Sequence, residues 1–164
     1  MSLRPLAIVL LLGVLAGCGF QLRGDARLPD AMAETFLAVP DRNSSFAREL
    51  TLRLRAGGVD VLHEPRDGSA ILRIHAERLR SEPLTISGQA RVREFVLVFD
   101  LDFELLDGRG EPLIARETLR LTREYSFDEQ AILAATREEE FLRAELRQAM
   151  ASRLMRRLEA IPAP

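Results

Sequence analysis

The segment 91–106, RVREFVLVFDLDFELL, constrains the fold of this chain more than any other stretch of its sequence. Phenylalanine and leucine alternate at every second position from Phe95 to Leu105, while glutamate, valine and aspartate fill the positions between them. Successive side chains of a strand point to opposite faces, so period two over this length predicts one long strand with a buried face. Such a strand needs neighbours in a sheet and a second layer over its apolar face.

Three further segments have the character of strands. Residues 70–80 and 113–124 also alternate, and the turn-like composition of 107–112, DGRGEP, joins the latter to the long strand as a hairpin. A shorter apolar stretch at 35–39 is ended by Pro40. Strict alternation divides 70–80 between two faces, with Leu72, Ile74 and Ala76 on the apolar face and Arg73, His75 and Glu77 on the polar face.

Two segments repeat their apolar residues at helical spacing. Asn43, Ser44 and Ser45 are candidates for a helix N-cap. Behind them Phe46, Leu50 and Leu54 recur every four residues up to a glycine pair, which predicts a helix at 45–56. The last segment carries a longer stripe, made of Leu142, Leu146, Met150, Leu154 and Leu158. Two candidate capping boxes stand near its start, Ser126 with Glu129 and Thr136 with Glu139.

These elements predict an α+β fold. We expect a single four-stranded sheet with two helices packed on one face, in the order β-α-β-β-β-α, because that arrangement buries every apolar stripe in the sequence.

The N-terminus has the plan of a secretory signal peptide that ends at a cysteine. Arg4 precedes an apolar run that is too short to span a bilayer, and small residues lead to Cys18, the only cysteine in the chain. Leu-Ala-Gly-Cys resembles a bacterial lipobox, in which the cysteine thiol receives a diacylglycerol and the new amino group is acylated. An ordinary signal peptide with a nearby cysteine is the alternative. We therefore expect a signal peptide at 1–17, a lipidated tether at 18–31 and one domain at 32–164.

The composition argues against several classes of function. A formal net charge of −2 gives no sign of a nucleic-acid partner. The two histidines, His63 and His75, lie in no catalytic or metal-binding motif, and Cys18 is taken up by the lipid. We expect no enzyme activity, no metal and no cofactor beyond the covalent lipid on Cys18.

Four arginines flank the loop SEPLTISGQA at 81–90. They are Arg78 and Arg80 before it and Arg91 and Arg93 after it. In a hairpin they would converge at one end of the sheet beside Leu84 and Ile86, and alternation places Arg78 and Arg80 on the face of Leu72 and Ile74. A basic cluster beside apolar side chains suits an amphipathic anion such as a phosphorylated lipid. The alternative is a solvated rim, partly neutralised by neighbouring glutamates.

The segment LAGCGFQLRG at 15–24 resembles the lipobox and first mature residues of the LPS-assembly lipoprotein LptE (RlpB) family. LRAGGV at 54–59 and SGQA at 87–90 extend the resemblance along the chain. It implies a lipoprotein anchored on the periplasmic side of the outer membrane, which partners and plugs the LptD β-barrel and helps lipopolysaccharide reach the cell surface.

The resemblance also implies two basic positions that bind lipopolysaccharide. At the first, before the SGQA turn, this sequence has Ile86, so Arg91 or Arg93 is the candidate to supply the charge. Arg137 matches the second. A lipid-trafficking adaptor without a barrel partner is the rival interpretation, and a lipoprotein enzyme is a weaker one.

Lipidation at Cys18 gives the first testable prediction. Mass spectrometry of the mature protein should find no residue before Cys18, and Cys18→Ser should leave the precursor uncut, because the hydroxyl is a poor substitute for the thiolate as a nucleophile. A Ser variant that matures normally and stays bound to the membrane would contradict the lipoprotein interpretation.

Overall fold

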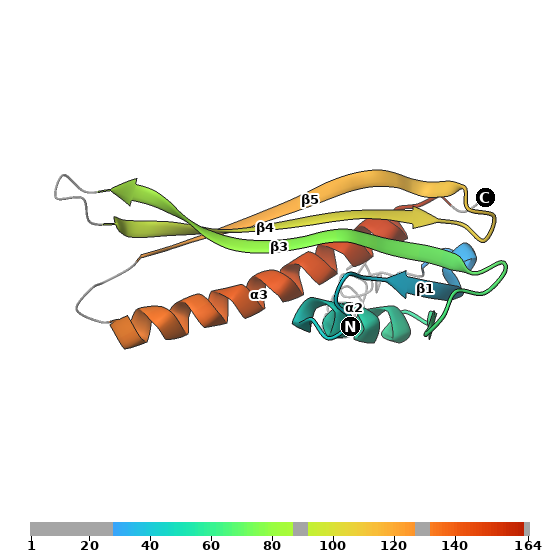
Figure 1. The fold of residues 1–164 in the computed structure, drawn as a ribbon, viewed down its shortest axis with the longest axis horizontal. Helices are drawn as coiled ribbons and strands as arrows, with labels where there is room; N and C mark the ends of the chain where they lie inside the picture. The colour runs from blue at the N-terminus through green and yellow to red at the C-terminus, as the bar shows by residue number, and fades with distance from the viewer. Residues whose placement is uncertain (1–27, 87–91, 127–131, 163–164) are drawn as a thin grey trace, which may run out of the picture.

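The computed structural model describes residues 28–86, 92–126 and 132–162 (Figure 1). Their elements are η1 (Asp30–Met32), β1 (Glu34–Ala38), α2 (Ser45–Ala56), β2 (Asp60–Leu62), β3 (Ala70–Ile86), β4 (Val92–Leu106), β5 (Pro112–Ser126) and α3 (Ile132–Glu159). The strands β3, β4 and β5 continue as a long ribbon beyond β1 and α2, and α3 runs along this ribbon. The signal peptide, Cys18 and Arg91 lie outside the described residues.

The sheet has five strands in the order β2-β1-β3-β4-β5. The strand β1 is parallel to both β2 and β3, whereas β3, β4 and β5 are antiparallel neighbours. The expected number of four strands is therefore wrong, because β2 was missed. It is only three residues long and opens on a charged residue, Asp60, so it offers no alternation that a sequence pattern could reveal.

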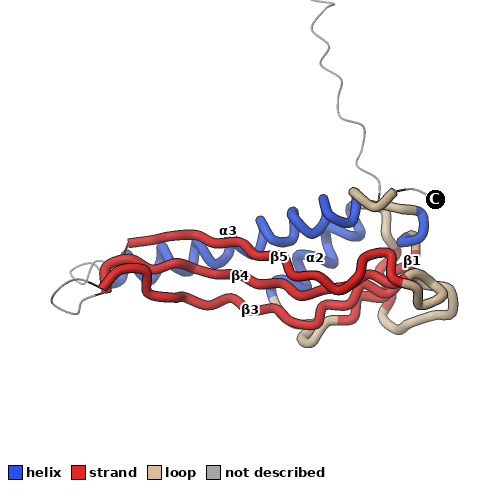
Figure 2. Tube along the Cα trace, turned by 90° about the horizontal axis from the view of Figure 1, so that it is seen from above, coloured by secondary structure: helices blue, strands red, loops and turns tan. Residues whose placement is uncertain are grey.

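Both helices pack on the same face of the sheet, as predicted (Figure 2). The apolar face of β4 is fully buried from Leu97 to Leu105, and the ring of Phe46 on α2 meets that of Phe99 edge-on, with centroids 5.6 Å apart. The predicted stripe of α3 packs against this core. We call the opposite side of the sheet, which neither helix covers, the outer face.

A β-bulge in β3 changes which residues point to the outer face. The register with β4 shifts between Ile74 and Ala76. Beyond His75 the side chains still alternate, but the odd-numbered and even-numbered residues have exchanged faces. Glu77 consequently faces α2, where its Oε2 accepts a hydrogen bond of 3.0 Å from Ser44 Oγ. The predicted assignment of residues to faces is thus wrong beyond the bulge, because Arg78 and Arg80 lie on the outer face and not on the face of Leu72 and Ile74.

The structure confirms the predicted cap of α2. Of the two capping boxes predicted for α3, Ser126 with Glu129 extends outside the described residues, and Thr136 with Glu139 is wrong. Ser44 caps α2, with its Oγ accepting a hydrogen bond of 3.0 Å from the backbone N–H of Ala47. Thr136 lies inside α3, where its hydroxyl donates to the carbonyl of Ile132 at 3.0 Å, so it is no N-cap. Within the described ranges, no helix has the length and apolar character needed to cross a membrane.

The buried face of β4 gives a stability prediction. Phe99→Ala should lower the free energy of unfolding by about 3–5 kcal/mol, because it removes a fully buried ring and leaves a cavity beneath α2. Phe141→Ala is the matched control, since that side chain is 69% exposed and its loss should change stability by less than about 0.5 kcal/mol. Urea unfolding of the two variants measures the difference, and equal losses would contradict the packing described here.

Candidate functional site

The arginines singled out by the sequence lie in three different places. Arg78 and Arg80 stand on the outer face of β3, and Arg137 lies exposed on α3. Arg93 belongs to β4, but its side chain is outside the described residues, as is all of Arg91. The side chains of two of the four arginines predicted to converge therefore lie outside the described residues, and the other two, Arg78 and Arg80, share one face of β3.

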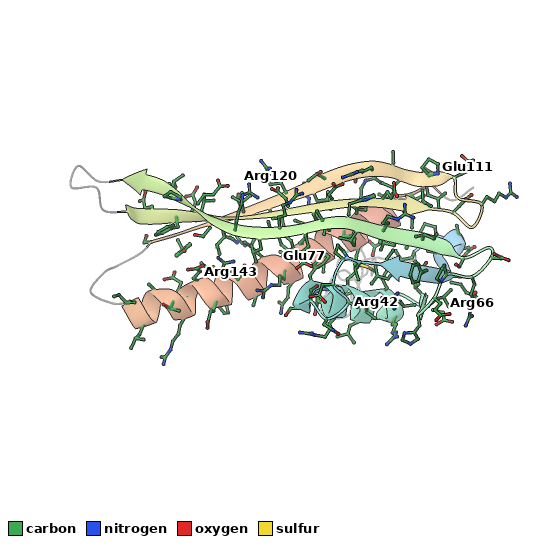
Figure 3. The ribbon with its side chains drawn as sticks, viewed as in Figure 1. Arg42, Arg66, Glu77, Glu111, Arg120 and Arg143 are labelled. Carbon is green, nitrogen blue, oxygen red and sulfur yellow. The ribbon has the colours of Figure 1, made fainter. Side chains whose placement is uncertain are left out.

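Arg80 is held in an ion-pair cluster at the centre of the outer face. Its Nε donates to Glu82 at 2.6 Å and its Nη1 donates to Asp100 Oδ2 at 2.7 Å. Arg120 on β5 donates to the same carboxylate, with Nε 2.5 Å from Asp100 Oδ1 (Figure 3). The hydrogen bonds from Arg120 and Arg80 lower the pKa of Asp100, although its burial opposes them. Asp100 is therefore the shared acceptor that connects all three long strands.

The pattern of ion pairs continues towards the β4–β5 turn. Arg116 makes a two-pronged contact with Asp102, with Nη2 2.5 Å from Oδ2, and this contact lowers the pKa of Asp102. Glu104 accepts a hydrogen bond of 2.5 Å from Arg73, and His75 Nε2 lies 3.4 Å from the same carboxylate without forming a hydrogen bond. The outer face of β4 is consequently acidic in sequence but neutralised in the structure.

Arg78 differs from its neighbours on the outer face. Its side chain is exposed, and it makes no ion pair with any residue of the described ranges. Arg80 would have to release hydrogen-bonded partners before binding another anion, whereas Arg78 has no such partner in the described part of the chain and acts on Asp102 only through its charge. Among the arginines predicted from the 81–90 loop, Arg78 is thus the one that the structure leaves accessible on β3.

Polar and aromatic contacts join the far ends of the long strands, and an ion pair on β5 reaches α3. The ring of Tyr125 stacks on Phe95 with centroids 5.5 Å apart, and its hydroxyl lies 3.1 Å from Ser81 Oγ. Burial raises the pKa of Tyr125 above its usual value. Arg123 Nη2 also donates to Glu145 of α3 at 2.9 Å. The contacts of Tyr125 join the three long strands to one another, whereas the pair of Arg123 with Glu145 attaches α3 to the sheet through charged groups, in contrast to the apolar packing of its C-terminal half.

The first turns of α3 expose apolar side chains around Arg137. Leu133 is 79% exposed and Phe141 is 69% exposed. Residues four apart lie on one side of a helix, so Leu133, Arg137 and Phe141 form a single exposed surface, which we call the α3 patch. The sequence analysis identified Arg137 but missed its apolar neighbours, although their spacing of four residues from the arginine could have revealed them.

In the part of the chain that the structure describes, the arrangement offers exposed charged and apolar surfaces and no recognisable catalytic group. The carboxylates of the outer face are engaged by arginines, and no cluster of metal-ligating side chains occurs among residues 28–86, 92–126 and 132–162. A cation beside exposed apolar side chains, as in the α3 patch, suits an amphipathic anion.

Comparisons with known proteins agree with this description. A family model described as "LptE: Lipopolysaccharide-assembly" matches residues 34–158. The LPS-assembly lipoprotein LptE of Photorhabdus laumondii is 27% identical over 162 residues, covering 95% of this chain and 87% of the relative. The protein of the same name from Yersinia enterocolitica is 28% identical over 166 residues, covering 98% and 79%.

Two solved structures share the fold. The solution structure of lipoprotein B from Nitrosomonas europaea matches with a TM-score of 0.73 and 27% identity, covering 87% of this chain and 91% of that one. The crystal structure of rare lipoprotein B from Shewanella oneidensis has a TM-score of 0.67 and 23% identity, covering 76% and 92%.

The Asp100 cluster predicts how stability depends on pH. Because the pKa of Asp100 is lower in the folded than in the unfolded chain, its stabilising effect is complete at pH 7 and disappears as the pH falls below about 4. Asp100→Asn should therefore have a lower melting temperature than the wild type at pH 7, and this difference in melting temperature should be smaller at pH 3. The measurement is the melting temperature at several pH values.

Asp60→Asn serves as the control for this series. Asp60 is an exposed aspartate on β2, away from the arginine cluster. The melting temperature of this variant should differ little from that of the wild type, because the side chain is exposed and forms no ion pair within the described ranges. A difference in melting temperature between Asp100→Asn and the wild type that does not change between pH 7 and pH 3 would show that the ion pairs contribute little to stability.

Proposed function

Because the chain belongs to the LptE lipopolysaccharide-assembly family, we propose that it partners and plugs an LptD-type β-barrel and assists insertion of lipopolysaccharide at the cell surface. The observation that carries this proposal is the family match over 34–158, together with relatives named LPS-assembly lipoproteins that cover nearly the whole chain. In this proposal the protein is lipid-anchored through Cys18 on the periplasmic side of the outer membrane and catalyses no reaction.

The outer face suits the inside of a barrel. The lumen of large outer-membrane barrels is polar, so a protein within it needs polar side chains that do not carry uncompensated charge. The pairs of Asp100 with Arg80 and Arg120, and of Asp102 with Arg116, give the outer face this character. These contacts support the placement of the outer face against a barrel wall.

Two described surfaces fit lipopolysaccharide, whose lipid A carries phosphates on an apolar body. The α3 patch combines Arg137 with Leu133 and Phe141, and Arg78 offers an unpaired cation on β3. Arg91 and Arg93 are proposed as further contacts on the strength of the sequence. Each charge-assisted contact contributes on the order of 1–3 kcal/mol, and less where solvent screens it.

Co-purification tests the barrel partnership. The tagged chain, extracted from outer membranes in a mild detergent, should carry with it one large β-barrel protein, identified by mass spectrometry. An inner-membrane transporter in place of the barrel would favour the lipid-trafficking adaptor, and no partner at all would remove the basis for the plug.

Binding to immobilised lipopolysaccharide tests the arginines separately. Arg137→Glu should weaken binding by about threefold to tenfold at low salt, and by less at high salt, because the contact is solvent-exposed. The double change of Arg91→Glu with Arg93→Glu is a parallel variant, and Arg109→Glu, in the β4–β5 turn, is the control. Unchanged binding by the first two variants, with intact melting temperatures, would assign these arginines to solvation or to barrel contacts.

A further inference from the structure

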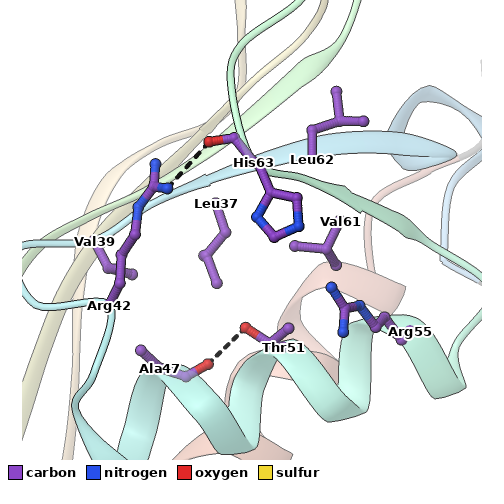
Figure 4. A pocket seen from close by; sticks show the side chains of 9 residues that line it. All are labelled: Leu37, Val39, Arg42, Ala47, Thr51, Arg55, Val61, Leu62 and His63. Atoms are coloured by element: carbon purple, nitrogen blue, oxygen red, sulfur yellow. Dashed lines mark hydrogen bonds between the residues drawn. The ribbon is translucent and has the colours of Figure 1, made fainter.

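A small pocket opens between α2 and the edge of the sheet (Figure 4). Its volume is about 160 Å³. Leu37 of β1, Val61 of β2 and Ala47 of α2 give it an apolar lining. Arg42, Arg55 and His63 stand around its mouth, and no acidic side chain of the described residues lines it. The pocket is thus apolar inside and basic at its entrance.

The basic entrance is partly fixed in place. Arg42 Nη1 donates to the backbone carbonyl of His63 at 3.1 Å, and its guanidinium carbon lies 5.4 Å from the centre of the Phe36 ring. These contacts hold the loop after β1 against the residue that follows β2. Arg55 approaches from the last turn of α2 and makes no ion pair within the described ranges. An incoming carboxylate would therefore meet a positioned arginine and an unpaired one.

The pocket adjoins an open strand edge. The strand β2 is the last in the sheet order, and the N–H of Asp60 donates towards β1, to Ala33 O, at 2.8 Å. Successive backbone groups in a strand point in alternate directions, so the N–H and C=O of Val61 point to the free edge. A residue paired with Val61 on that side would direct its side chain to the same face as Val61, which is the face of the pocket.

The size of the pocket limits what can enter it. A cavity of about 150 Å³ lined by apolar side chains holds one benzene molecule. This pocket accordingly accommodates one large apolar side chain and is too small for a lipid. Strand addition places alternate side chains of a peptide into such pockets while its backbone pairs with the edge.

We propose that the edge of β2 binds an extended segment of a partner protein as a sixth strand. The residue opposite Val61 is large and apolar and fills the pocket, and a residue two positions away carries a carboxylate that meets Arg42 and Arg55. The tether at 19–27 lacks this pattern, because its one acid, Asp25, has Arg23 and Arg27 two positions away. This interaction is separate from the α3 patch and does not rest on the proposed function.

A synthetic peptide, acetyl-Thr-Thr-Phe-Thr-Glu-Thr-Thr-amide with a fluorescent label, is the probe. The mature chain in lipid nanodiscs should raise its fluorescence anisotropy with a dissociation constant below about 1 mM. Replacing the phenylalanine by alanine should weaken binding about tenfold or more, as expected for an apolar side chain that becomes buried. No binding up to about 1 mM, or equal binding of the two peptides, would overturn the proposal.

Variants on α2 test the site itself. Thr51→Phe fills the pocket and should weaken binding about tenfold, whereas Leu52→Phe, at a position that is 63% exposed and turned away from the pocket, should change it less than about twofold. Melting temperatures check folding. Arg55→Glu should bind the original peptide less tightly and regain affinity for a peptide with lysine in place of glutamate. If Arg55→Glu does not bind the lysine peptide more tightly than the original peptide, the proposal is overturned, even where Thr51→Phe fails to fold.

Discussion

The burial of one face of β4 is the constraint on which the rest of the structure depends. Six apolar side chains, from Phe95 to Leu105, lie on one face of this strand. Because the neighbouring strands β3 and β5 cover only the edges of β4, a second layer has to cover this face. The helices α2 and α3 supply the cover, and the edge-on contact between Phe46 and Phe99 joins the N-terminal half of the domain to the long ribbon. The outer face is left free of helices as a direct consequence.

The outer face needs its negative charges balanced. Its central strand is acidic, and an acidic surface pressed against another polar surface would bring uncompensated charge out of water. The arginines of β3 and β5 meet these carboxylates across the strands, most clearly at Asp100, which two guanidinium groups share. The bulge at His75 makes this possible, because it brings Arg80 to the outer face and sends Glu77 to the end of α2.

The two halves of α3 differ in how they contact the rest of the domain. Its C-terminal half buries Leu146, Met150 and Leu154 and completes the core. Its N-terminal half is linked to β5 by the ion pair of Arg123 with Glu145, and it exposes Leu133 and Phe141 to solvent, where they add nothing to the stability of the isolated domain. The α3 patch and the basic pocket at the edge of β2 are two surfaces that we propose for binding, and they lie far apart on the domain (Figure 1).

The sequence by itself determined the α+β class, the long strands, both helices and the family, because period two, period 3.6 and the N-terminal motif are local patterns. It could not determine β2, which is too short to show a period and exists only because β1 offers an edge for pairing. Nor could it place Arg78 and Arg80, since a bulge inverts the alternation without a local signal at His75. Only the tertiary structure decided which arginines meet carboxylates and which stay free, because that depends on the register between strands far apart in the chain.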